Sequence, residues 1–295
     1  MIVRVLGSAA GGGVPQWNCA CANCRAAREG RQPRRSSSSF AFSADGARWW
    51  LVNASPDVAQ QIEAFPALTP GAGRGTPLAG MLLTDANIDH VGGFAVLRQQ
   101  GEHRFDIFSS ASVRDILLGQ PEFAPFAAPP HRWDAVGLGG VFELAGTLQV
   151  RVVELPGLTP GYAGRIARRD AVVAYLVADS ATGGSALFAP VFAECADGLL
   201  AAARAATVAF FDGSFWSDDE LDGVGVAKSA RALGHAPISG DGGTLARLAA
   251  LPPGGRRYFA HLNNTNPALD PASRAHAAIA RAGLALAEDG LQLEV

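Results

Sequence analysis

Three cysteines at metal-ligand spacing are the first residues whose types suggest chemistry. Cys19, Cys21 and Cys24 form a C-x-C-x2-C cluster, and three thiolates this close can converge on one tetrahedral zinc ion. The alternative is three free thiols in a loop. No general base lies nearby in the sequence, so we expect a structural site. Its fourth ligand stays open: Cys195 is expected in the core but is also a candidate, and a histidine, an asparagine or a water could equally complete the tetrahedron.

A second group of metal-binding side chains stands in two segments that lie far apart in the sequence. Asp89 and His90 follow the apolar run 81–83, and His261 leaves the run 258–260 into a polar loop. An aspartate that caps an ordinary helix would explain the first segment alone. Together, however, one carboxylate and two imidazoles make the ligand set of non-haem Fe(II) sites with open positions for O₂. We therefore predict an active-site metal on these three residues.

These side chains must be positioned by the elements that precede them, and short apolar runs predict the strands. Strands are predicted over 2–6, 40–42, 49–52, 81–83, 148–154, 172–178, 186–188, 207–211 and 257–260. Longer segments with helical patterning are 56–65, 194–205, 242–251 and 271–282. Two halves, each with strands first and helices after, favour two sheets packed between helices in a single domain over 1–295.

Composition excludes several classes of partner. Of the 295 residues, 48% are hydrophobic and 17% charged, which fits a globular protein with a sizeable core. The formal net charge of −3 gives no electrostatic footprint for nucleic acid. No apolar stretch approaches the ~20 residues that span a bilayer, and the first residues show no signal peptide. We expect a cytoplasmic protein with neither nucleic acid nor membrane as a partner.

The first metal segment resembles the metallo-β-lactamase signature H-x-H-x-D-H. Asp85 and Asn87 occupy the two leading histidine positions, whereas Asp89 and His90 keep the last two. A dinuclear hydrolytic site needs the leading histidines for its first metal. A bridging aspartate of the superfamily would fall near 189–190, where this chain has Ala-Pro. The resemblance therefore implies one metal rather than two.

Longer strings resemble the pyrroloquinoline quinone biosynthesis protein B family in order and spacing from residue 1 to 295. They are LGSAAGGGVPQWNC (6–19), TDANIDH (84–90), DGSFWSDDE (212–220), GDGG (240–243) and HLNNTNP (261–267). The resemblance implies a metallo-β-lactamase-like αββα sandwich, with two mixed sheets flanked by helices. It also implies an iron-dependent hydroxylase that acts on the tyrosine ring of a Glu-Tyr-derived intermediate in cofactor biosynthesis.

The resemblance further suggests roles for residues near the predicted metal. Phosphodiesterases of the superfamily have a carboxylate and a histidine at places comparable to Asp212 and His235, so we predict a catalytic acid/base pair there. A turn aspartate with a hydrogen-bonded histidine is the alternative. Asp85, Asn87 and Trp216 are predicted to contact the substrate, with packing in the core as the alternative for the tryptophan. The resemblance also suggests Asn264 as the fourth ligand of the cysteine site, because relatives have a histidine at this position, three residues past the metal histidine.

Two places depart from the family's pattern. The stretch 155–171 is short and has no histidine, where relatives carry a longer His- and Pro-rich loop. Arg114 stands where a histidine is usual. If the loop shapes the substrate pocket, the substrate of this chain differs from that of its relatives.

Three functions are compatible with these residues. The first is an oxygenase that uses O₂ and a small tyrosine-derived peptide or diamino acid, with Fe²⁺ in the active site and Zn²⁺ on the cysteines. The second is a metal-dependent hydrolase, which a second metal on Asp85 and Asn87 would favour. The third is a carrier for pyrroloquinoline quinone, which tight quinone binding without turnover would favour. The sequence leaves the metal identity, the electron donor and a homodimer open.

Overall fold

Two seven-stranded sheets form the centre of the computed structural model, which describes residues 1–71, 73–99 and 103–295. The strands of the first sheet are β1 (Ile2–Gly7), β2 (Ser39–Ser43), β3 (Trp49–Val52), β4 (Leu78–Leu82), β5 (Asp106–Ser109), β6 (Arg132–Ala135) and β14 (Gln292–Glu294). Those of the second sheet are β7 (Val141–Glu143), β8 (Leu148–Leu155), β9 (Val172–Asp179), β10 (Ser185–Ala189), β11 (Val208–Asp212), β12 (Arg256–Ala260) and β13 (Ala285–Leu286). Many of their residues are Val, Phe and Trp, whose side chains fit a pleated, buried surface.

Both sheets are mixed, and this decides where the functional loops meet. The spatial orders are β14-β1-β2-β3-β4-β5-β6 and β13-β12-β11-β10-β9-β8-β7. From β3 to β6 and from β10 to β13 the neighbouring strands run parallel, whereas the other pairs are antiparallel. The carboxyl ends of parallel strands lie at one edge of a sheet, so the loops that follow β11 and β12 lie at one edge of the second sheet, and the loop that follows β4 lies at an edge of the first.

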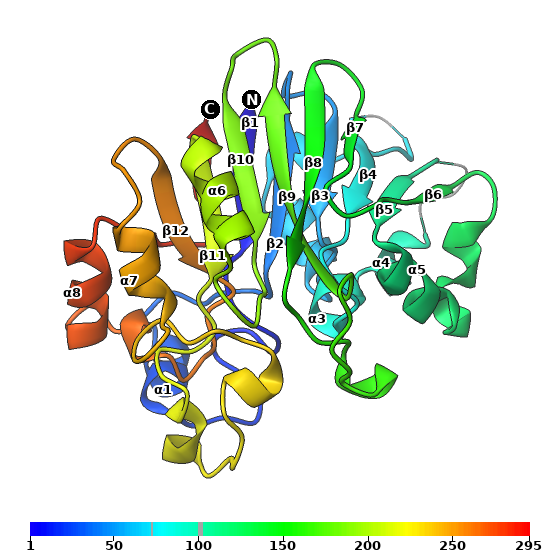
Figure 1. Ribbon diagram of the computed structural model, residues 1–295. Helices are drawn as coiled ribbons and strands as arrows, with labels where there is room; N and C mark the ends of the chain where they lie inside the picture. Colours follow the sequence, from blue (N-terminus) through cyan, green and yellow to red (C-terminus); the bar gives the residue numbers. More distant parts are fainter. Residues whose placement is uncertain (72, 100–102) are drawn as a thin grey trace.

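Helices cover the outer faces of the two sheets (Figure 1). They are α1 (Ala22–Arg28), α2 (Val58–Glu63), α3 (Ile88–Val91), α4 (Phe94–Leu97), α5 (Ala111–Leu118), α6 (Asp197–Ala205), α7 (Thr244–Ala249) and α8 (Arg274–Arg281). Short 3-10 helices are η1 (Pro66–Leu68), η2 (Pro121–Ala127), η3 (Gly161–Ala163), η4 (Glu220–Val224), η5 (Arg231–Leu233) and η6 (Pro267–Leu269). In Figure 1, α1 and α3 lie at the lower end of the molecule, beyond the sheets.

The apolar core has three layers. One cluster fills the space between the sheets, with Phe40 and Phe42 of the first sheet against Phe188 of the second at ring-centroid distances of 5.2 and 5.8 Å. A second cluster joins the second sheet to α6, α7 and α8, and a third joins the first sheet to α2, α4 and α5. This arrangement confirms the predicted αββα sandwich.

Most predicted elements are confirmed, with limits. The predicted strands agree with the structure to within one residue, except that the strand predicted over 81–83 is Leu78–Leu82. Five strands are not among those predicted: β5, β6, β7, β13 and β14. All five are short, and β5 and β6 carry charged residues such as Asp106 and Arg132. In the structure, the helices predicted over 56–65, 194–205, 242–251 and 271–282 begin two or three residues later than predicted. Among the described residues, none of the helices combines the length and apolarity that crossing a membrane requires.

Candidate metal centre

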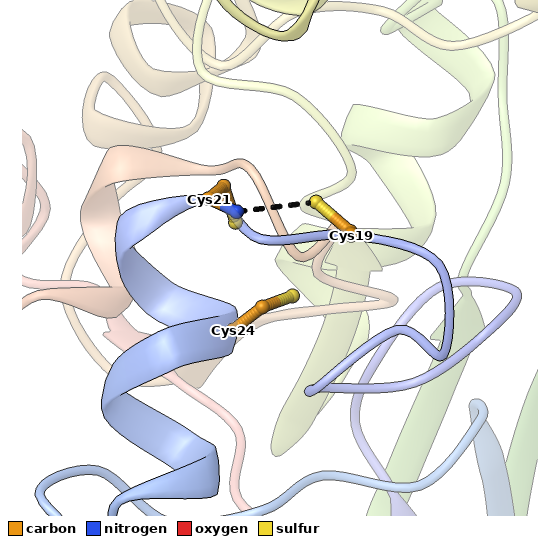
Figure 2. Close-up of side chains that lie close together, drawn as sticks. All are labelled: Cys19, Cys21 and Cys24. Carbon is orange, nitrogen blue, oxygen red and sulfur yellow. Dashed lines mark hydrogen bonds between the residues drawn. The ribbon is translucent and has the colours of Figure 1, made fainter.

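The three cysteines of the predicted zinc site lie together at the beginning of α1 (Figure 2). Cys21 is the residue that precedes the helix, Cys24 lies in its first turn, and Cys19 belongs to the loop before it. Their sulfur atoms all lie within 4.8 Å of one another. Three sulfurs at this separation fit one tetrahedral ion. Cys195 lies away from them in the core, as predicted.

Asn264 completes the surroundings of the sulfurs. Its side-chain nitrogen lies 3.0 Å from Sγ of Cys19, 3.5 Å from Sγ of Cys21 and 3.3 Å from Sγ of Cys24. The amide carries an oxygen and a nitrogen, and half a turn exchanges their places. Burial opposes the charge on Cys21, but hydrogen bonds from Cys24, Cys19 and Asn264 lower the pKa of its thiol. The group thus fits a zinc ion with the amide oxygen in the fourth position.

The second metal-binding group joins the two sheets. Asp89 and His90 follow β4 in α3, and His261 follows β12. Nε2 of His261 lies 3.1 Å from Oδ2 of Asp89, and Nε2 of His90 lies 3.9 Å from the same oxygen. Two ligand atoms that are each about 2.1 Å from one ion lie at most roughly 4.2 Å apart. Both distances satisfy this limit.

The surroundings of His90 indicate whether a metal ion fits this site. Its side chain is fully buried, and among the described residues its Nε2 has no hydrogen-bond partner. A buried nitrogen without a partner costs free energy, and a metal ion would satisfy it. Burial opposes the charge on this imidazole, but the carboxylates of Asp85 and Asp89 raise its pKa to about 9. The negative field that holds a proton there also attracts a cation.

Asp85 holds His90 in the orientation that a metal ligand needs. Its Oδ2 lies 2.7 Å from Nδ1 of His90, and Thr84 and Asn87 supply its three other hydrogen-bond donors. Because a carboxylate only accepts, Nδ1 keeps its proton, and Nε2 is the nitrogen at which an ion could take the place of a proton. Asp85 is fully buried, and its contact with substrate stays a prediction. All its acceptor positions are used by these donors.

A shared hydroxyl organises the other half of the site. Oγ of Ser214 lies 2.6 Å from Oδ1 of Asp212 and 2.8 Å from Nδ1 of His261. The hydroxyl proton must point to the carboxylate, so Oγ accepts from Nδ1 of His261, and an ion would take the place of the hydrogen bond that joins Nε2 of that ring to Asp89. His261 itself has a φ of 55°, an uncommon conformation for a residue with a side chain. Ser214 was not singled out in the sequence, because no spacing rule pairs it with a histidine 47 residues away.

Asp212 and His235, which were predicted as an acid/base pair, lie within hydrogen-bond distance of each other. Oδ2 of Asp212 lies 2.7 Å from Nδ1 of His235, whose ring stacks on that of His261 at 5.4 Å between centroids. Burial opposes the charge on His235, but Asp212 raises the pKa of the imidazole. Asp212 also accepts from Ser214 and from the backbone of Phe192. Although Asp212, His235 and His261 could together hold an ion, these donors make the carboxylate an anchor for the two rings.

The remaining predicted residues surround this centre. Asn87 is bonded to Asp85 through both its backbone and its side-chain nitrogen. Trp216 is partly buried and packs against the core, which favours the packing alternative. Gly11 lies so close to Asp89 that a Cβ atom there would come within 3.1 Å of Oδ2. The glycine-rich loop before the cysteines therefore packs against the side chain of Asp89.

Fold and site together define a class of protein. The family model of the β-lactamase superfamily domain matches residues 48–262, a range that includes every predicted ligand of the active-site metal. The chain is thus a β-lactamase superfamily protein whose signature segment keeps the Asp-His pair and replaces both leading histidines.

Within this superfamily the chain belongs to the coenzyme PQQ synthesis protein B family. It is 38% identical over 302 residues to that protein of Ruegeria pomeroyi, with 99% of both chains covered, and 40% identical over 311 residues to that of Azoarcus sp., with 100% of both covered. The solved structure of zinc-bound PqqB from Methylobacterium extorquens matches over 100% of both chains, with 35% identity and a TM-score of 0.94. A diphosphatase of the PhnP family, at 20% identity and a TM-score of 0.70, shares the fold.

Proposed function

We propose that this chain acts in coenzyme PQQ synthesis as an iron-dependent oxygenase that hydroxylates the tyrosine ring of a Glu-Tyr-derived precursor. Family membership supports the pathway. The reaction rests on one observation: Asp89, His90 and His261 bring one carboxylate and two Nε2 atoms together, whereas Asp85 is used to orient His90. A set of three ligands on one side of an ion suits Fe(II) chemistry with O₂.

A ferrous ion held by these residues would supply the redox chemistry that O₂-dependent hydroxylation requires. The overall reaction balances when one oxygen atom replaces a ring hydrogen as a hydroxyl group. The other atom leaves as water, with two electrons and two protons from an external reductant. The protein must therefore bind the aromatic ring, hold the ligands in place and transfer protons.

His235 is the residue that we propose for proton transfer. Asp212 binds its Nδ1, so Nε2 remains to accept or release a proton beside His261. The side chain of His235 is 15% exposed, and that of Asp89 is 21% exposed, whereas His90 is fully buried. A substrate would approach the group from the side of these two exposed residues.

The cysteine site is proposed to hold zinc without taking part in the reaction. Asn264 belongs to the same loop as His261, and Cys21 and Asn23 both bond to its backbone oxygen. An ion on the cysteines would stabilise the loop that carries an active-site ligand.

The reaction is tested with full-length protein purified without O₂ and loaded with Fe(II). Given O₂, a reductant and the dipeptide Glu-Tyr, it should form a ring-hydroxylated product that mass spectrometry detects at 16 mass units above the dipeptide, about one oxygen atom. His90→Ala should abolish the product. Equal product with zinc alone, or faster hydrolysis of a phosphodiester or lactone, would overturn the proposal in favour of a hydrolase. Tight quinone binding without any turnover would favour a carrier instead.

A further inference from the structure

An ordered hairpin lies within the stretch 155–171 that distinguishes this chain from its relatives. Leu158 and Ala167 pair as an antiparallel bridge. The backbone nitrogen of Thr159 donates to the oxygen of Ile166 at 2.9 Å, and its hydroxyl accepts from the nitrogen of Ile166 at 2.8 Å. The turn between them contains η3. We call residues 158–167 the bridging hairpin.

The hairpin connects the two segments that carry the active-site histidines. The hydroxyl of Tyr162 donates to the backbone oxygen of Ala86 at 2.5 Å, in the segment that leads to His90. On the other side, Leu158 packs against Gly234, next to His235. Nη1 of Arg165 donates to the backbone oxygen of Leu233 at 3.1 Å. The hairpin thus spans from the loop of the first sheet to the loop of the second, beside the metal group.

Arg165 combines a backbone conformation that favours glycine with an exposed, charged side chain. Its φ is 50°, a conformation that glycine adopts freely and an arginine does not. Residues with side chains in such conformations cluster at functional sites. The guanidinium group is exposed, and within residues 1–71, 73–99 and 103–295 no carboxylate forms an ion pair with it. Glycine would fit the backbone better but could not make the hydrogen bond to Leu233, which uses one nitrogen of the guanidinium group.

The net charge of the metal group determines which substrates need a positively charged side chain nearby in order to bind. Asp85, Asp89 and Asp212 bring three carboxylates to the metal group. With neutral imidazoles and one divalent ion, the group keeps about one negative charge. A substrate that itself carries carboxylates would be repelled unless a cation faced it. Arginine binds a carboxylate through two parallel hydrogen bonds.

We propose that Arg165 determines substrate specificity by binding a carboxylate of an aromatic amino-acid or dipeptide substrate at the bridging hairpin. The inference rests on the proposed function for the identity of the site, but it concerns binding and not oxidation. It predicts that the protein prefers an aromatic ligand with free carboxylates over the same ligand with its carboxylates converted to amides.

The test compares the binding of two probes, Glu-Tyr and its diamide, to the full chain under argon by calorimetry. The wild-type protein should bind Glu-Tyr at least 10-fold more tightly, which is about 1.4 kcal/mol. Arg165→Gly should remove this preference while the affinity for the diamide changes less than about 2-fold. Glycine relieves the backbone conformation but removes the hydrogen bond to Leu233, so the two effects on stability oppose each other, and thermal unfolding checks that the variant is folded. Arg168→Ala, which removes an equal charge three residues away, should keep the preference.

Three results would overturn the assignment. They are a wild-type protein without preference between the probes, an Arg165→Gly variant that weakens both equally, and an Arg168→Ala variant that loses as much as Arg165→Gly. Because no O₂ is present, a missing hydroxylase activity does not change any of these outcomes. Conversely, a preference that depends on Arg165 in a protein without hydroxylase activity supports the inference and overturns only the proposed reaction.

Discussion

At the scale of residues, the site is built from imidazoles whose Nδ1 atoms are all bound. His90 donates to Asp85, His235 donates to Asp212, and His261 reaches Asp212 through the hydroxyl of Ser214. Carboxylate partners of this kind fix the ring orientation and the position of the proton, and they raise the basicity of the nitrogen that faces the metal. The three histidines thus depend on only two carboxylates, both buried.

Replacing Ser214 tests this arrangement. Ser214→Ala removes the acceptor for Nδ1 of His261 and one donor to Asp212, which leaves buried polar atoms without partners at a cost of about 1–3 kcal/mol. We expect the affinity of the active-site metal to fall about 10- to 100-fold, measured by competition with a chelator. Ser214→Thr should restore most of it. A variant with lower stability but unchanged metal affinity would show that the hydroxyl only supports the fold.

At the scale of elements, hydrogen bonds hold helix α1 against the loop after β12. The side-chain nitrogen of Asn23 donates to the backbone oxygens of Asn264 and Asn266, at 3.0 and 2.9 Å. The cysteines lie at the same junction. Zinc there would add a covalent-strength link between two segments that are separated by most of the chain, and it would stabilise only the folded state.

Replacing one cysteine should therefore lower zinc content and stability together. In Cys21→Ser, a hydroxyl that stays protonated at neutral pH replaces a thiolate, so we expect loss of the zinc and a fall of several kcal/mol in the free energy of unfolding. Metal analysis and urea unfolding measure the two effects. Cys195→Ser, a change in the core, should lower stability but keep the zinc. Full zinc retention in Cys21→Ser with unchanged unfolding would refute a site on these cysteines.

Glu220 connects the loop after β11 to the loop after β12 through a hydrogen bond. Its carboxylate accepts from the backbone of Trp216 and the hydroxyl of Thr265, and burial raises its pKa to about 7 from an ordinary 4.5. The folded protein therefore binds a proton more tightly than the unfolded chain. This stabilises the fold fully below pH 4.5, and the contribution is lost as the pH rises through about 7.

The variant Glu220→Gln keeps the shape of the side chain but does not titrate. The free energy of unfolding of the wild type, relative to this variant, should fall by roughly 1–3 kcal/mol between pH 5 and pH 8. Urea unfolding of both proteins at the two pH values measures the difference. Parallel pH profiles would mean that Glu220 is not protonated in the folded state at neutral pH.

At the scale of the whole molecule, the sequence predicts the layers better than the contacts between them. Apolar runs mark most strands, and the Asp-His pair after one strand and the histidine after another together make the ligand set of one metal centre. The three ligands of the predicted active-site metal could therefore be proposed from local sequence patterns. The cysteine cluster could be proposed even more directly, since its three ligands lie within a few residues.

Other features depend on distances that no local pattern encodes. Ser214 meets His261 only because β11 and β12 are parallel neighbours. The signature suggested that Asp85 contacts substrate, but its burial and its bond to His90 become visible only when the loop is closed around it. The bridging hairpin joins segments from both sheets, and a short loop without histidines gave no indication of that connection.

The most direct test of a mononuclear site is the metal content of the full chain purified without O₂. Native mass spectrometry and elemental analysis should find one iron and one zinc per chain. His90→Ala and His261→Ala should each lose the iron and keep the zinc, and Asp89→Asn should lose nearly as much iron, because the carboxylate neutralises part of the charge of the ion. Two ions besides the zinc, both lost in His90→Ala, would contradict the mononuclear site and restore a two-metal hydrolase.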